Sequence, residues 1–116
     1  MYLYREGKNK KLKEVGYWRK ANAIHGWIVN NVQEGEDDCN DYDFPLEKMV
    51  ELCSLCKQIL KNPCPENYSL LPITRGFFFG NHIIDDYYLE YLNNTVKILK
   101  KCLKNPDKRY IYGSSW

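Results

Sequence analysis

The sequence predicts an α+β fold in which three helices pack on a small antiparallel sheet formed by the two ends of the chain. Two short segments rich in strand-forming residues, Met1–Arg5 and Arg109–Tyr112, lie at opposite ends of the sequence. Between them, three stretches carry apolar residues at helical spacing. A chain of 116 residues is long enough to bury one core, so we expect a single domain over residues 1–116.

The first helix is predicted over about Val15–Asn31, after a basic turn at Glu6–Lys13. At 100° per residue, one face of this helix collects side chains that we expect to be buried, namely Tyr17, Ala21, Ile24, Ile28 and Val32. A second row beside that face combines an aromatic ring, an amide and an imidazole: Trp18, Asn22, His25 and Val29. This row holds the densest set of groups capable of chemistry.

Two further helices are bounded by start and stop signals. The second begins at Phe44-Pro45, because proline fits the first helical position, and it ends before Pro63. Its predicted buried face consists of Leu46, Met49, Val50, Cys53, Cys56 and Leu60. The third helix runs from about Asp85, a favourable N-cap, to Leu103. Its predicted buried face consists of Tyr88, Tyr91, Leu92, Thr95, Leu99 and Cys102.

The connections between these elements differ in character. Residues 33–43 form an acidic loop, and residues 63–74 contain three prolines and are predicted to be irregular. Residues 75–82 place three phenylalanines between two glycines, which indicates either a short buried strand or a tight crossing loop.

Charge is unevenly distributed along the chain. The net charge of +2 is too small to imply nucleic-acid binding, which we do not expect. Residues 1–20 contain seven bases and two acids, whereas residues 34–43 contain six acids and no base. This pattern fits solvated loops and helix faces, and it also fits a dipolar surface that attracts a charged partner.

Five cysteines, an odd number, favour free thiols over disulfides. The chain opens without an apolar leader and contains no apolar run of membrane-spanning length, so we expect a cytoplasmic protein. The Cys53-x-x-Cys56 pair falls in the middle of a predicted helix, without the second pair that a zinc site needs. We therefore expect buried thiols, and neither a metal site nor a cofactor.

The best candidate binding site combines rings for stacking, cations for phosphate and amides for a base edge. Its residues are Trp18, Arg19, Asn22, His25, Arg75, Phe78 and Asn81. This inventory suits a nucleotide-like small molecule, although the same aromatic rings would serve equally well as core. No phosphate-binding glycine loop is present in the sequence.

Four stretches, taken together, resemble a group of small uncharacterised proteins common in tailed bacteriophages and prophages. They are Y-L-Y-R at residues 2–5, Y-W-R-K-A-N-A-I-H at 17–25, L-L-P-x-x-x-G-F-F-F-G at 70–80 and the closing S-S-W. The resemblance implies a phage or prophage setting inside a bacterial host cell. Small accessory proteins from that setting often counter bacterial defence, by sequestering a signal nucleotide or by blocking a defence protein.

The leading hypothesis is a non-enzymatic accessory protein that binds a nucleotide-like molecule between the first helix and residues 75–81, within one chain or between copies. The alternative is an inhibitor of a bacterial defence protein, in which the acidic residues 34–43 mimic nucleic-acid phosphate or dock on a basic partner. Its candidate residues are Glu36, Asp37, Asp38 and Asp41. A small hydrolase or transferase using His25 is less favoured, because no nucleophile or orienting carboxylate has the spacing that would support it. We therefore assign no catalytic residue.

Overall fold

The computed structural model describes residues 1–36, 38, 40–73 and 86–114. In chain order the elements are β1 (Tyr2–Glu6), η1 (Lys8–Lys10), β2 (Leu12–Tyr17), α1 (Asn22–Asn31), β3 (Tyr42–Asp43), α2 (Leu46–Lys61), α3 (Pro65–Tyr68), α4 (Asp86–Leu103) and β4 (Tyr110–Gly113). Three of these helices are long, and the strands form one antiparallel sheet, so the predicted α+β class is confirmed.

The two ends of the chain pair in the sheet, as predicted. The strand order is β2-β1-β4-β3, and every neighbouring pair is antiparallel. Leu3 in the central strand β1 has Gly16 of β2 and Tyr112 of β4 as its partners. The pairing of β1 with β4 therefore closes the fold across almost the whole length of the sequence.

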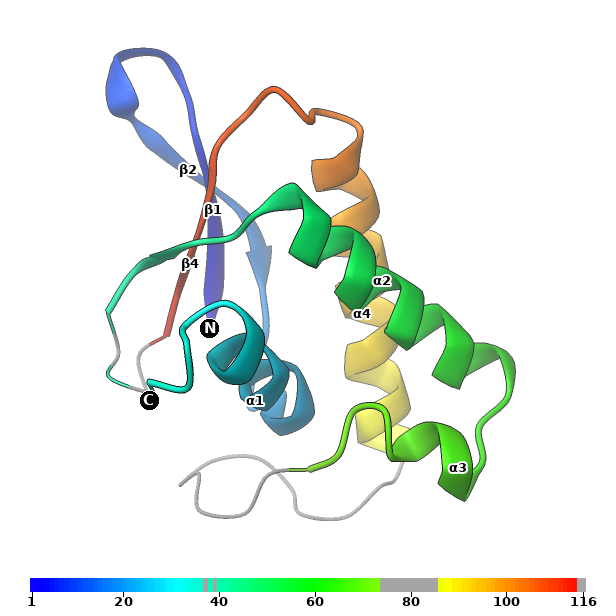
Figure 1. The fold of residues 1–116 in the computed structure, drawn as a ribbon. Helices are drawn as coiled ribbons and strands as arrows, with labels where there is room; N and C mark the ends of the chain where they lie inside the picture. The colour runs from blue at the N-terminus through cyan, green and yellow to red at the C-terminus, as the bar shows by residue number, and fades with distance from the viewer. Residues whose placement is uncertain (37, 39, 74–85, 115–116) are drawn as a thin grey trace.

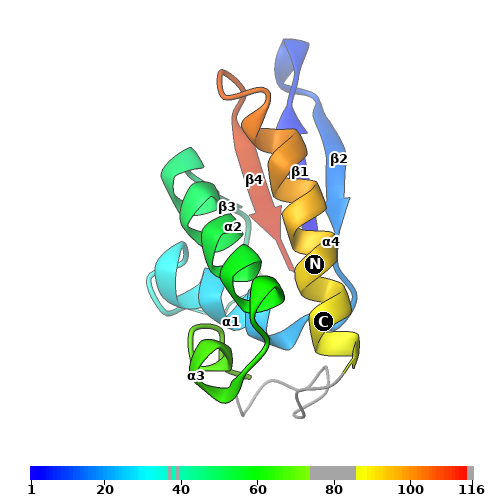
Figure 2. The ribbon, with the colours of Figure 1, turned by 90° about the vertical axis from the view of Figure 1, so that its right-hand side faces the viewer.

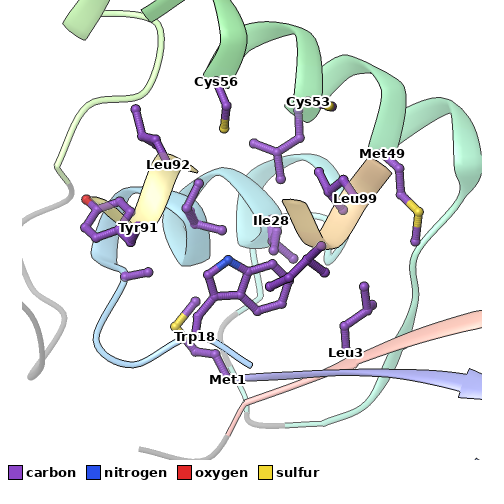
Figure 3. Packing of buried hydrophobic residues seen from close by; sticks show 14 of the residues in the cluster. Met1, Leu3, Trp18, Ile28, Met49, Cys53, Cys56, Tyr91, Leu92 and Leu99 are labelled. Atoms are coloured by element: carbon purple, nitrogen blue, oxygen red, sulfur yellow. The ribbon is translucent and has the colours of Figure 1, made fainter. Parts of the chain in front are cut away.

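Helices α2 and α4 pack against each other and cover one face of the sheet (Figures 1 and 2). Figure 3 shows the core between these helices and the sheet, where Leu3 of β1, Ile28 of α1 and Leu99 of α4 converge. None of these three side chains has exposed surface. The helix α1 joins this core through Ala23, whose backbone N–H donates to the Tyr91 hydroxyl at 3.3 Å. None of the helices in the described part of the chain combines the length and apolar character needed to cross a bilayer.

The prediction of a first helix over Val15–Asn31 is wrong for its first seven residues. Val15, Gly16 and Tyr17 belong to β2, and α1 begins only at Asn22. Two physical causes explain the difference. Residues 12–17 pair with β1, and Lys20 has φ 51°, a left-handed conformation that interrupts a right-handed helix. Tyr17, expected to be buried, is 48% exposed.

The predicted turn at Glu6–Lys13 is also too long. Glu6 ends β1, and β2 starts at Leu12, so only the segment between them, including η1, reverses the chain. The resulting hairpin places β2 at one edge of the sheet. Three small elements were not predicted: η1 within the turn, β3 within the acidic loop and α3 within the irregular segment.

The second and third helices agree closely with their predicted bounds. Every residue predicted for the buried face of α4 is buried. In α2 the prediction holds for Met49, Cys53 and Cys56, but Val50 is 55% exposed. Pro45 is the N-cap of α2 rather than its first helical residue. Predictions for residues 75–82 and for Asp85 lie outside the described residues.

Candidate functional site

Trp18, predicted to contact ligand, lies in the core and is 1% exposed. Its indole Nε1 donates to Thr95 Oγ1 at 2.7 Å, and Thr95 Oγ1 in turn donates to the Tyr91 carbonyl at 2.7 Å (Figure 3 shows the ring). The Trp18 ring also meets the ring of Tyr112 edge to face, with centroids 6.1 Å apart. Trp18 thus joins the loop after β2 to α4 and β4.

Asn22 and His25 are also fully buried. The His25 Nδ1 lies 2.7 Å from the Tyr112 hydroxyl, a hydrogen bond between α1 and β4. Trp18, Asn22 and His25, the row predicted to contact a ligand, are therefore all buried in the core. The sequence allowed these residues to be either a binding site or part of the core, and the structure shows the second. Arg75, Phe78 and Asn81, the other half of the predicted site, lie outside the described residues.

Arg19, in contrast, is exposed and borders a surface groove of about 560 Å³. The groove runs between the end of β2 and the first two-thirds of α4. Its lining residues mix aromatic, cationic and amide groups: Tyr17, Arg19, Tyr87, Glu90, Tyr91, Asn93, Asn94 and Lys97. Of the residues predicted for ligand binding, Arg19 belongs to this lining.

Two hydrogen bonds hold the wall of the groove against α4. Asn94 Nδ2 donates to the Tyr17 carbonyl at 3.1 Å, and the Tyr87 hydroxyl donates to the Arg19 carbonyl. Tyr87, Tyr91 and Asn94 are spaced by four and three residues, so they share one face of the helix. The Tyr87 and Tyr91 rings meet edge to face, with centroids 5.6 Å apart.

The charges of the groove gather around Tyr87. Burial raises the pKa of the Tyr87 hydroxyl; the positive charge of Arg19 lowers this pKa, and the negative charge of Glu90 raises it. The hydroxyl therefore stays protonated and remains a donor near neutral pH. Arg19 and Lys97 give the groove two cations against the single carboxylate of Glu90. Rings, cations and amides are groups suited to binding, and the carboxylate of Glu90 is a group that can also act as a base.

The groove residues of α4 were missed at the sequence level. Tyr87 and Tyr88 are adjacent on a helix and so cannot both face the core. Because Tyr88 was predicted to be buried, this spacing indicated that the Tyr87 ring would lie at the surface. In the structure Tyr88 is 1% exposed, whereas Tyr87 is 36% exposed. The sequence offered no signal that the Tyr17 end of β2 would lie beside Tyr87.

The acidic loop keeps its predicted exposure at Glu36, Asp38 and Asp41, while Asp37 lies outside the described residues. Asp38 accepts a hydrogen bond from the Tyr42 hydroxyl at 2.8 Å and another from the Asn40 backbone at 3.1 Å. These two hydrogen bonds lower the pKa of the Asp38 carboxyl. The bond to Asp38 raises the pKa of the Tyr42 hydroxyl to about 12. The end of the loop is thereby attached to β3.

The cysteine pair of α2 lies on the buried face, as predicted. Burial raises the pKa of the Cys56 thiol well above its ordinary value, and it raises the pKa of Cys102 to about 11. Both groups therefore remain neutral thiols. Cys39 lies outside the described residues. Among the residues that are described, no three His, Cys, Asp or Glu side chains gather closely enough to hold a metal ion.

No family model, curated protein or solved structure matches this chain.

Proposed function

We propose that this protein binds a small anionic molecule that carries an aromatic ring, such as a nucleotide, in the groove between β2 and α4. The observation that carries this proposal is the juxtaposition of the exposed Tyr17 and Tyr87 with Arg19 and Lys97. Stacking on an aromatic ring contributes about 1–3 kcal/mol per base. A guanidinium forms strong charge-assisted hydrogen bonds with phosphate.

The size of the groove favours a small ligand. Sites for small molecules typically enclose about 300–1,000 Å³, and this groove, at about 560 Å³, falls within that range. The carboxylate of Glu90 and the amide of Asn93 add groups that can pair with the edge of a base or with ribose hydroxyls. The ligand class is that predicted from the sequence, but the proposed site is a different one, with Arg19 as the shared residue.

Binding without turnover is the activity that we propose. In the phage setting implied by the sequence resemblance, such a protein would sequester a signalling nucleotide in the host cell. The composition of the groove supports this role, because its lining offers two cations and exposed aromatic rings to an anionic ligand that carries a ring.

Calorimetric titration with AMP, ATP and cyclic dinucleotides tests the proposal. Arg19→Ala and Lys97→Ala should each weaken binding about 10-fold, because a hydrogen bond to a charged group contributes about 1.5–3 kcal/mol. Lys57→Ala is the matched control, since it removes another exposed lysine, from α2, and should leave the affinity unchanged. The affinity for nucleotide should also fall as salt increases.

Two results would contradict the proposal. One is an affinity that Arg19→Ala and Lys97→Ala leave unchanged. The other is recovery of a chemically altered nucleotide, by mass spectrometry, after incubation with the protein, since this would indicate an enzyme.

A further inference from the structure

The second face of the sheet is not covered by any helix in the described part of the chain (Figure 1). The strand register identifies the side chains on this open face. Tyr2 is paired with Tyr17 and with Gly113, and Tyr4 is paired with Glu14 and with Ile111. Partners across an antiparallel pair lie on the same side of the sheet. Apart from Gly113, all of these side chains are exposed or half-buried.

Three tyrosine rings make a continuous aromatic surface on this open face. The Tyr2 and Tyr4 rings are nearly parallel, at an interplanar angle of 19° with centroids 6.0 Å apart. The Tyr2 and Tyr17 rings are tilted by 45°, with centroids 5.2 Å apart. Tyrosines on a solvated sheet face add little to the core, so their clustering here points to a partner that uses the rings.

Carboxylates border this aromatic surface. A Cβ placed on Gly113 would lie 2.6 Å from Asp41 Oδ1 and 4.0 Å from Tyr4 Cε2, so the Asp41 carboxylate lies over Gly113 and beside the Tyr4 ring. Glu14 is the β2 partner of Tyr4. Burial, with the negative charges of Glu14 and Asp41, raises the pKa of the Tyr4 hydroxyl. Two acids therefore lie next to the same ring.

The other charges of this face are also net negative. Arg109 contacts Asp43 at 2.8 Å and Glu6 at 3.1 Å, so its single positive charge is shared between two carboxylates. Glu14 and Asp41 form no ion pair within the described residues, although the half-buried amino group of Met1 lies near enough to Glu14 to feel its charge. Glu14 also lines a cleft that contains the cations Arg5, Lys13 and Lys101. Among the described residues that the register and contacts place on the open face, the carboxylates of Glu6, Glu14, Asp41 and Asp43 outnumber the cation Arg109.

We propose that the open face of the sheet binds an arginine-bearing segment of a partner protein. A guanidinium can stack on a tyrosine ring and form paired hydrogen bonds with a neighbouring carboxylate. The Tyr4 ring between Glu14 and Asp41 offers both interactions at one place. A nucleic acid would instead bring its phosphates against Glu14 and Asp41. The inference goes beyond the nucleotide groove, and it gives the acidic-loop alternative a defined surface through Asp41.

Binding of a synthetic octapeptide of alternating arginine and glycine, followed by ¹⁵N NMR, tests this inference. The amide signals of β1, β2 and β4 should shift, and the corresponding lysine peptide should bind more weakly because ammonium cannot stack as a plane. The double variant Glu14→Gln/Asp41→Asn should weaken arginine-peptide binding about 10-fold, through the loss of charge-assisted hydrogen bonds. Tyr4→Ala should also weaken it, whereas Tyr4→Phe keeps the ring and should retain it.

The matched control is Glu66→Gln/Asp107→Asn, which makes the same charge change at exposed positions away from the open face and should leave peptide affinity unchanged. Equal weakening by both double variants, shifts confined to the helices, absence of peptide binding, or tighter binding of a single-stranded oligonucleotide at this face would each overturn the inference. Tyr17 borders both surfaces, so none of the variants changes it. Nucleotide titration of the Glu14/Asp41 variant separates failure of this inference from failure of the groove.

Discussion

The Tyr112 ring contacts rings from three other segments of the chain. Its centroid lies 5.9 Å from that of the His25 ring, 6.1 Å from that of Trp18 and 6.5 Å from that of Phe44. Its hydroxyl reaches His25 Nδ1 at 2.7 Å, and the side chain has no exposed surface. The imidazole that the sequence offered for ligand contact is therefore used inside the fold, to hold α1 against β4.

Tyr112→Phe should lower the free energy of unfolding by about 1–3 kcal/mol, because it leaves the buried imidazole nitrogen without this hydroxyl. Tyr42→Phe makes the same chemical change in a hydroxyl that bonds to the exposed Asp38, and it should cost less. Urea unfolding followed by circular dichroism compares the two variants. Equal losses would show that burial does not set the strength of the His25–Tyr112 contact.

At the scale of elements, the contact between β2 and α4 depends on the absence of a side chain at Gly16. A Cβ added there would lie 2.5 Å from Ile98 Cγ2, closer than packed atoms approach. Ile98 is 8% exposed and belongs to the core side of α4. This close approach keeps the end of β2 beside α4, where Tyr17 and Arg19 form one wall of the groove.

Gly16→Ala should therefore destabilise the protein by about 1–3 kcal/mol through overpacking, and it should also weaken nucleotide binding by moving Tyr17 and Arg19. Gly7→Ala is the control, since a Cβ there would meet only the Lys11 carbonyl, at an ordinary 3.5 Å. Ile98→Ala in the Gly16→Ala background removes the clashing atoms and should cost less than Ile98→Ala costs in the native chain. Additive costs would contradict the proposed clash.

At the scale of the whole molecule, buried titratable groups make stability depend on alkaline pH. Burial raises the pKa of Cys56, and it raises the pKa of Cys102 from 9.0 to about 11. The unfolded chain therefore loses its thiol protons at a lower pH than the folded chain does. The resulting stabilisation is complete below pH 9 and is lost as pH rises through the folded pKa.

Unfolding free energy measured under reducing conditions should be level from pH 7 to 8.5 and should fall above pH 9, by up to about 1.4 kcal/mol per pH unit for each thiol held neutral. Cys102→Ala should make this fall in unfolding free energy less steep, because one of the two thiols that cause it is removed. Leu99→Ala destabilises the same helix without removing a titratable group and should leave the slope unchanged. A slope that Cys102→Ala does not change would contradict the assignment.

The sequence by itself determined the parts of this protein that rest on local patterns. The helices α2 and α4 were predicted because each has an apolar stripe and a start signal, and β1 and β4 because strand-forming residues gather at the two ends. The cysteine pair was correctly placed in the core for the same reason: its spacing puts it on the apolar face of a helix.

Only the tertiary structure decided the surfaces proposed for binding. The strand β2 was missed because it is an edge strand with little buried surface, so its residues lack the alternation that marks a half-buried strand. Arg19 and Tyr87 are separated by 68 positions, and Tyr4 and Asp41 by 37, so no local pattern could join them. Trp18 and His25, predicted to contact a ligand, instead lie in the core, because Trp18 bonds to Thr95 of α4 and His25 of α1 bonds to Tyr112 of β4. Such pairings form only when distant segments bury their apolar faces together.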